Sequence, residues 1–295
     1  MLVERFISSA LILEPEALAS RGLYRSDVQK IYCERMLTMS LPTWRDVVIE
    51  NARSMKLSGC YLSADVPGAP TLVICHGFTG SKEGGGKALE MAEYFTRAGF
   101  DSLLFDFAGN GESEGRWADI TLSGQIDDLT CCIDWCLERG SGYVVTLGRS
   151  FGGTTAICQA ATDTRVRGVC TWAASIDPYG LFRGFADPKT LGSEWVALNS
   201  EDGTVEVNQA FLSDLSRHDV LQAASCIPPR PLLILHGDRD EVVTPSDAEA
   251  LYNAAGDPRE LHLLPQADHR FSETSKQAWE LTLQWLLRIS GRAKE

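Results

Sequence analysis

The sequence has 295 residues, enough for one large α/β domain, and its 44% hydrophobic and 23% charged residues are ordinary for a globular protein. Its formal net charge is −13, and its Lys and Arg residues form no cluster, so nucleic acid and anionic membranes are disfavoured as partners. No apolar run approaches the roughly 20 residues that a membrane-spanning helix needs.

The first 42 residues are predicted to be an N-terminal helical extension (1–42) that precedes a single domain over 43–295. A short apolar stretch over 6–13 resembles the centre of a secretory signal, but Glu4 lies where such signals are basic and Glu14 ends the stretch. The nine cysteines contain no C-x-x-C pair, and several lie in apolar patterns typical of buried, reduced thiols. We therefore expect a cytoplasmic protein.

Strand-like and helix-like segments alternate along the chain. A first pair of strands is predicted at 46–50 and 57–62, with a hairpin turn between them. A continuous apolar run, typical of a parallel strand covered on both faces, follows at 71–75, and further strands are predicted at 101–107, 143–147, 167–173, 230–237 and 261–264. Helices are predicted to end near 98 and to span about 123–139, 154–161, 246–255 and 272–289. This order predicts an α/β fold with a mostly parallel, eight-stranded sheet flanked by helices.

One long insertion, about 176–229, breaks the alternation. It is rich in Gly, Pro and aromatic residues, and one helix is predicted near 211–224. A segment of this length is expected to fold as a small cap rather than as a plain loop. Its aromatic residues and one that precedes it either line an apolar pocket or form the cap's own core: Trp172, Phe182, Phe185, Trp195 and Phe211.

The motif that stands out is Gly148-Arg149-Ser150-Phe151-Gly152, a G-x-S-x-G sequence between a predicted strand and a predicted helix. This context is typical of a nucleophile elbow, a tight turn that exposes a serine hydroxyl at the carboxyl end of a sheet. Glycines are required on both sides, because a Cβ would crowd the neighbouring backbone. The free amides at the start of the following helix face any oxyanion that forms there.

A base and an acid are predicted at the ends of the last two strands. Of the five histidines, only His269 lies past the last predicted strand, at the sheet edge that also carries Ser150. Asp240 follows the preceding strand and is the preferred acid, with Asp238 as the alternative. Such a carboxylate orients the histidine and stabilises its imidazolium form.

Backbone amides, rather than side chains, are expected to form the oxyanion hole. One amide belongs to Phe151, directly after the serine, and the other to Phe78 in the loop after the strand at 71–75. Asp106 also ends a strand, but we expect it to anchor the glycine-rich turn that follows, where Asn110 and Ser113 make local hydrogen bonds.

Together these segments resemble the α/β-hydrolase superfamily, over about 46–290. The motifs that carry the resemblance lie at 76–80, 105–113, 148–153, 236–243 and 268–271. The chain is most similar to cinnamoyl/feruloyl esterases and to serine aminopeptidase-type hydrolases, although those esterases often have His and Gln where this chain has Arg149 and Phe151. The resemblance implies an α/β-hydrolase fold with a cap. It also implies a Ser150–His269–Asp240 triad, with Phe78 and Phe151 as oxyanion donors.

The expected function is hydrolysis of carboxylic esters through an acyl-enzyme, as in a cinnamoyl/feruloyl-type or a short-chain carboxylesterase. The same triad serves amidases, aminopeptidases and thioesterases, so these activities stay open as alternatives. A catalytically silent binding protein is a further alternative, but its expected mark is a missing triad residue. No metal and no organic cofactor is implied. The expected partner is a small-molecule ester, and homodimer formation is left open.

Overall fold

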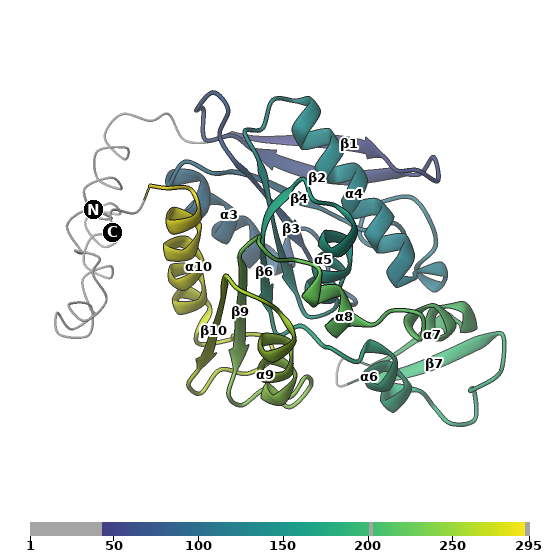
Figure 1. Ribbon diagram of the computed structural model, residues 1–295. Helices are drawn as coiled ribbons and strands as arrows, with labels where there is room; N and C mark the ends of the chain where they lie inside the picture. The colour runs from purple at the N-terminus through teal and green to yellow at the C-terminus, as the bar shows by residue number, and fades with distance from the viewer. Residues whose placement is uncertain (1–42, 201–202, 293–295) are drawn as a thin grey trace, which may run out of the picture.

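A twisted eight-stranded sheet forms the centre of the protein (Figure 1). The computed structural model describes residues 43–200 and 203–292, so the predicted N-terminal extension lies outside the described residues. The strand order is β1-β2-β4-β3-β5-β6-β9-β10. The bounds are β1 Trp44–Glu50, β2 Lys56–Leu62, β3 Thr71–Cys75, β4 Asp101–Phe105, β5 Val144–Arg149, β6 Val166–Trp172, β9 Leu232–Gly237 and β10 Arg259–Leu264.

Only β2 runs against the direction of the other strands. β1 pairs antiparallel with β2, and β2 pairs antiparallel with β4, whereas all pairings from β4 to β10 are parallel. Every residue of β3, β4 and β9 is buried, which explains why apolar residues dominate their sequences. The predicted fold class, a mostly parallel eight-stranded sheet, is confirmed.

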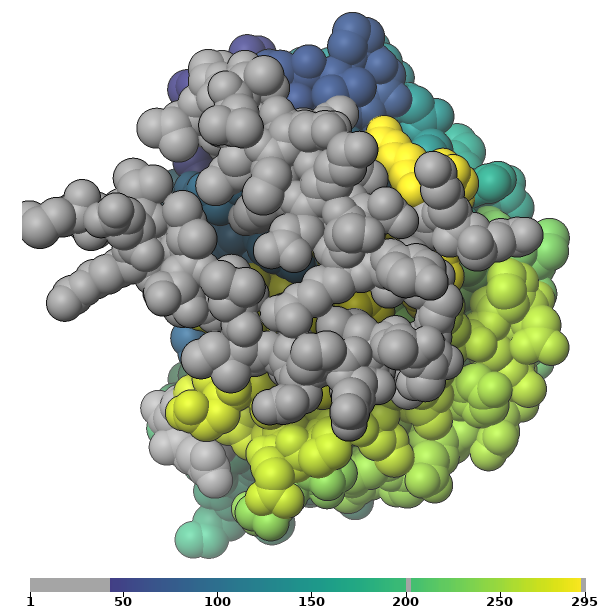
Figure 2. Space-filling view, turned by 90° about the vertical axis from the view of Figure 1, so that its left-hand side faces the viewer, coloured from purple at the N-terminus to yellow at the C-terminus, as the bar shows by residue number. Residues whose placement is uncertain are grey.

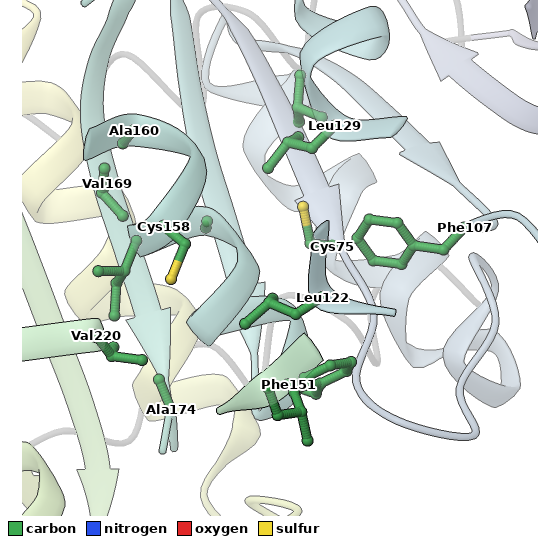
Figure 3. Packing of buried hydrophobic residues seen from close by; sticks show 14 of the residues in the cluster. Cys75, Phe107, Leu122, Leu129, Phe151, Cys158, Ala160, Val169, Ala174 and Val220 are labelled. Atoms are coloured by element: carbon green, nitrogen blue, oxygen red, sulfur yellow. The ribbon is translucent and has the colours of Figure 1, made fainter. Parts of the chain in front are cut away.

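Helices cover both faces of the sheet (Figure 1). Their bounds are α3 Lys87–Arg97, α4 Leu122–Glu138, α5 Phe151–Thr162, α9 Pro245–Ala254 and α10 Ser275–Ile289, with single 3-10 turns η2 at Gly84–Gly86 and η3 at Trp117–Asp119. One face packs against α4, α5 and α9, and Figure 3 shows Leu122, Phe151 and Cys75 within this layer. The other face packs against α3 and α10. Figure 2 shows that side, with purple and blue segments above the yellow and yellow-green C-terminal part.

The predicted insertion contains more structure than the sequence indicated. Between β6 and β9 lie α6 Pro178–Phe185, β7 Trp195–Ser200, β8 Gly203–Asn208, α7 Gln209–Leu215 and α8 Val220–Ser225. β7 and β8 form a separate antiparallel pair. The prediction of a single helix near 211–224 was wrong, because two helices occupy this segment. Asp219 caps the second helix by accepting a hydrogen bond from the Gln222 amide at 2.9 Å.

A buried ion pair ties the loop after β3 to the loop after β4. Asp106 is fully buried and accepts hydrogen bonds from the Lys82 amide (2.7 Å), the Lys82 ammonium (2.9 Å) and the Glu112 amide (3.0 Å). Burial alone would lower the pKa of Lys82, but hydrogen bonds to Glu112, Asp106 and Glu83 outweigh burial and raise this pKa. Asp106 thus anchors the turn, and it also fixes the loop that carries Phe78.

Replacing this carboxylate should destabilise the protein strongly. Asp106→Ala leaves the Lys82 ammonium, whose side chain is 5% exposed, without its buried partner. We expect the free energy of unfolding to fall by about 3–5 kcal/mol, as for other broken buried pairs, measured by urea denaturation. Glu112→Gln is the control, because the Glu112 side chain is 74% exposed and should cost far less. Equal losses in the two variants would contradict the anchoring role.

Candidate active site

The nucleophile elbow has the backbone geometry that its glycines predict. Ser150 lies between β5 and α5 with φ 53° and ψ −123°, a region that residues with a Cβ rarely occupy. A Cβ on Gly148 would collide with the Gly152 carbonyl oxygen, and one on Gly152 would collide with the His76 carbonyl oxygen. The Ser150 amide donates to the Trp172 carbonyl at 2.7 Å. The tight turn therefore holds the Ser150 hydroxyl at the carboxyl edge of the sheet.

The structure brings the three residues of the predicted triad together. His269 Nε2 lies 3.0 Å from Ser150 Oγ, and His269 Nδ1 lies 2.8 Å from Asp240 Oδ2. Ser150 follows β5, Asp240 follows β9 and His269 follows β10, so parallel strands present all three at one edge. Both distances are within hydrogen-bond reach of a base that is oriented by a carboxylate.

Asp240 is held in its ionised form. Burial alone would raise the pKa of this carboxyl, but hydrogen bonds with His236 and His269 outweigh burial and keep the pKa well below its ordinary value. Its other oxygen accepts the backbone amides of Val242 (2.9 Å) and Val243 (2.8 Å). These contacts leave one oxygen, Oδ2, directed at His269.

His236 contacts the carboxylate of Asp240 and helps to hold it in place, a role that we did not predict. Its side chain is fully buried, and its Nε2 lies 2.8 Å from the Val243 carbonyl and 3.3 Å from Asp240 Oδ2. The histidine thus links the end of β9 to the loop that returns toward α9. The sequence signal was the four-residue spacing between His236 and Asp240 after an apolar strand.

Asp238, the alternative acid, takes a different position. Its carboxylate accepts the Gln266 amide at 2.6 Å, and its own amide donates to the Leu264 carbonyl. Asp238 therefore ties the loop after β9 to the loop after β10. Its carboxylate makes no hydrogen bond to His269 among the residues that the structure describes.

The two amides predicted as oxyanion donors are both unengaged. Within residues 43–200 and 203–292, neither the Phe78 amide nor the Phe151 amide donates to a protein acceptor. The Phe151 amide is the first of α5, where no intrahelical acceptor exists. The rings of Phe78 and Phe151 lie 6.2 Å apart, edge to face, so the two segments meet beside Ser150.

His76 fixes the conformation of the loop that carries Phe78. Its Nδ1 lies 2.8 Å from the Gly77 carbonyl, and its Nε2 lies 3.2 Å from the Phe107 amide. Burial lowers the pKa of His76, so the neutral ring donates through Nδ1 and accepts through Nε2. The sequence placed His76 only at a strand end, and its side chain turns out to join the loops after β3 and β4.

The cap packs directly on this loop through aromatic rings. Phe78 contacts Phe182 of α6 at 4.6 Å between ring centroids and Phe211 of α7 at 5.7 Å, and Phe151 contacts both. Phe182 and Phe211 are buried, so they form a shared core between the cap and the elbow. Trp172 does not belong to this shared core. Its ring packs on Phe271, and its Nε1 donates to Thr282 of α10 at 3.2 Å.

A second serine, histidine and aspartate meet where the cap joins α4. Ser123 Oγ donates to Asp214 at 2.6 Å and lies 3.0 Å from His218 Nε2. That same nitrogen also faces Asp214 at 3.6 Å. The aspartate therefore does not orient the opposite ring nitrogen, as a triad acid must. This cluster lies at an ordinary helix start and joins α7 to α4.

The described residues contain no group of three His, Cys, Asp or Glu side chains that could hold a metal ion. None of the helices in residues 43–200 and 203–292 combines the length and apolar character needed to cross a membrane. The cysteines described in the structure are free thiols, and burial raises the pKa of several of them, for example Cys158 to about 12.

Comparison with known proteins agrees with this architecture. Residues 70–193 match the family model of the alpha/beta hydrolase fold. The uncharacterized protein YfhR of Salmonella typhimurium is 29% identical over 173 residues, which cover 57% of this chain and 54% of YfhR. An uncharacterized protein of Mycobacterium tuberculosis is 23% identical over 237 residues, or 79% of this chain and 75% of that protein. The match thus spans about half the length of YfhR.

Solved structures show the same fold. Est1E from Butyrivibrio proteoclasticus with bound ferulic acid superposes with a TM-score of 0.75 at 20% identity, covering 83% of this chain and 99% of Est1E. The esterase domain of a Rhodothermus marinus protein gives a TM-score of 0.67 at 24% identity, covering 83% and 98% of the two chains. The chain has the α/β-hydrolase fold, and its predicted resemblance to the α/β-hydrolase superfamily is confirmed.

Proposed function

We propose that this chain is a serine hydrolase that cleaves carboxylic esters through an acyl-enzyme. The observation that carries the proposal is the continuous contact from Ser150 Oγ to His269 Nε2 (3.0 Å) and from His269 Nδ1 to Asp240 Oδ2 (2.8 Å). These three side chains come from three separate loops, and a hydrogen-bonded line of this kind suits activation of a serine hydroxyl.

In the proposed reaction, Ser150 Oγ attacks the ester carbonyl while His269 Nε2 takes the hydroxyl proton. The carbonyl oxygen becomes an oxyanion that the Phe78 and Phe151 amides stabilise. His269 then gives its proton to the leaving alcohol, and the acyl group stays on Ser150. Water attacks this acyl-enzyme, again with His269 as base, and His269 returns the proton to Ser150 Oγ as the carboxylic acid leaves. Asp240 keeps the imidazole oriented and stabilises its charged form throughout.

Two ester classes remain candidates for the substrate. Est1E is described with ferulic acid bound, which supports a cinnamoyl/feruloyl-type esterase. The residues on either side of Ser150 are Arg149 and Phe151, unlike the His and Gln frequent in that branch, which favours a short-chain carboxylesterase. We propose the cytoplasm as the site of action and a small-molecule ester as the partner.

A panel of esters tests the proposal. The purified full chain should hydrolyse p-nitrophenyl esters, and a fluorophosphonate probe should label Ser150 in the folded protein. Acetate, butyrate and octanoate esters measured beside methyl ferulate separate the short-chain class from the cinnamoyl class. Matched thioesters and anilides measure the competing activities of the same triad.

The outcomes separate the alternatives. Faster turnover of the anilide or thioester than of the matched ester would replace the esterase proposal by an amidase or a thioesterase. Absence of both labelling and turnover would mean a binding protein with a hydrolase fold.

A further inference from the structure

Arg149, the residue directly before Ser150, is a half-buried cation without a counterion. Its side chain is only partly exposed. Among residues 43–200 and 203–292, no carboxylate or carbonyl oxygen accepts a hydrogen bond from its guanidinium. Burial lowers the pKa of Arg149, and the nearby charge of Arg270 lowers this pKa further. A guanidinium withdrawn from water is unfavourable unless an anion or several acceptors face it.

The carboxylates closest to Arg149 are already engaged. The two acidic side chains whose charge acts on it are Asp240 and Asp268. Asp240 accepts two backbone amides on one oxygen and faces His269 with the other. Asp268 accepts both the amide (2.8 Å) and the hydroxyl (2.7 Å) of Ser272. Neither carboxylate can turn to Arg149 without giving up these bonds, so no acidic side chain within residues 43–200 and 203–292 neutralises this cation.

The Arg149 guanidinium adjoins the loop of the candidate oxyanion site. A Cβ built on Gly77 would lie 3.7 Å from Arg149 Nη2 and 3.3 Å from Ser150 Cβ. The guanidinium therefore lies against the backbone of the loop that presents the Phe78 amide. Arginine is long and presents a rigid, planar fork of donors. A charged group on an ester held at Ser150 would be within its reach.

We propose that Arg149 is a specificity-determining residue that binds a carboxylate of the substrate, so that the enzyme prefers esters that carry a negative charge. The inference rests on the proposed esterase function. An Arg–carboxylate contact is charge-assisted and frequently bidentate, which gives it geometric selectivity. The net charge of −13 otherwise repels anions, so acceptance of an anionic ester would require a local cation of this kind.

Four esters in two matched pairs test the proposal and locate the carboxylate. The acyl-side pair is the p-nitrophenyl monoester of adipic acid and p-nitrophenyl hexanoate. The alcohol-side pair is 4-carboxyphenyl hexanoate and 4-carbamoylphenyl hexanoate. In the full-length protein we expect kcat/KM to favour the anionic member of one pair by about tenfold or more. Arg149→Gln should reduce that ratio about tenfold, and Arg149→Lys should reduce it less, because the ammonium keeps the charge without the fork.

Arg167→Gln is the matched control. Arg167 is an exposed residue at the start of β6, at the opposite end of the sheet from Ser150, and its loss should leave the ratio unchanged. Turnover of the neutral esters with no preference for charge in either pair would overturn this inference alone. If Arg149→Gln lowered kcat/KM equally for both members of a pair, this inference would also be overturned, because Arg149 would then act as a positioning residue. No turnover of any of the four esters would overturn the proposed function and this inference with it.

Discussion

Ser150→Ala should reduce kcat on p-nitrophenyl esters by about 10⁴- to 10⁶-fold, the range found when a serine nucleophile is removed. Only the hydroxyl is lost, and alanine keeps the Cβ that already tolerates the φ of 53° at this position. The variant should therefore fold normally, with KM changed little, and should no longer react with a fluorophosphonate probe. Steady-state kinetics, probe labelling and thermal unfolding measure the three effects.

Ser123→Ala is the matched control for this experiment. Ser123 Oγ also lies 3.0 Å from a histidine nitrogen and 2.6 Å from an aspartate, but it has neither the strained elbow nor the free amides beside it. We expect Ser123→Ala to stay within about threefold of the wild-type kcat, in the range of an ordinary surface substitution. A large loss of kcat in Ser123→Ala, together with full activity in Ser150→Ala, would identify Ser123 rather than Ser150 as the nucleophile.

Asp240→Asn should lower kcat by about 10⁴-fold, as in other triads whose acid is neutralised. The introduced side-chain amide could donate to His269 Nδ1, which would place the proton of neutral His269 on the nitrogen that must accept from Ser150. In the wild type the depressed pKa of Asp240 keeps this group ionised at every pH above its ordinary value of about 4. Asp240 should therefore stay ionised as the pH falls from neutral toward about 5, so that acidification over this range leaves the carboxylate that orients His269 unchanged.

Asp238→Asn distinguishes the two candidate acids. Asp238 accepts one backbone amide, that of Gln266 at 2.6 Å, and an asparagine oxygen can accept the same bond. Its kcat should remain within a few-fold of wild type. If Asp238→Asn instead lost as much activity as Asp240→Asn, the acid would be assigned to the wrong aspartate of this loop.

The same depressed pKa has a consequence for stability. Because the folded-state pKa of Asp240 lies below its unfolded value, ionised Asp240 stabilises the fold above about pH 4 and this contribution is lost as pH falls through the folded pKa. The difference in melting temperature between wild type and Asp240→Asn should accordingly narrow between about pH 7 and about pH 3. A difference that stays constant over this range would show that the carboxylate has the same pKa in both states.

The parallel strands could be predicted from sequence because burial on both faces leaves a direct trace. Thr71–Cys75 and Leu232–Gly237 are buried at every position, so Leu72–Cys75 and Leu232–Leu235 appear as unbroken apolar runs. Ser150, Asp240 and His269 could be selected because parallel strands end at one edge, which turns chain order into spatial proximity.

The cap was less predictable. β7 and β8 bury Val196, Leu198 and Val207 and leave the alternate positions partly or fully exposed. This pattern was present in the sequence, and we did not use it. The split between α7 and α8 depends on one capping bond from the Asp219 side chain, and a single capping residue is a weak signal within a polar segment.

Side-chain contacts between distant loops could not be predicted at all. No sequence motif singles out Lys82, yet its side chain is only 5% exposed and pairs with Asp106, which is 24 residues away. His76 and His236 looked like strand ends, and their roles depend on which carbonyl or amide the fold brings to each ring nitrogen. Pairings of this kind follow from the assembled topology, and local sequence carries no record of them.

Two parts of Phe78, its backbone amide and its ring, have separate roles, and this affects how such an enzyme could evolve. We propose its backbone amide as an oxyanion donor, while its ring packs against Phe182 and Phe211 of the cap. A cap mutation that reshapes the space for a new substrate also shifts the ring, and with it the amide. Selectivity and turnover would then change together along a mutational path. We expect new specificities in this lineage to arise through paired changes, one in the cap and one that restores the loop.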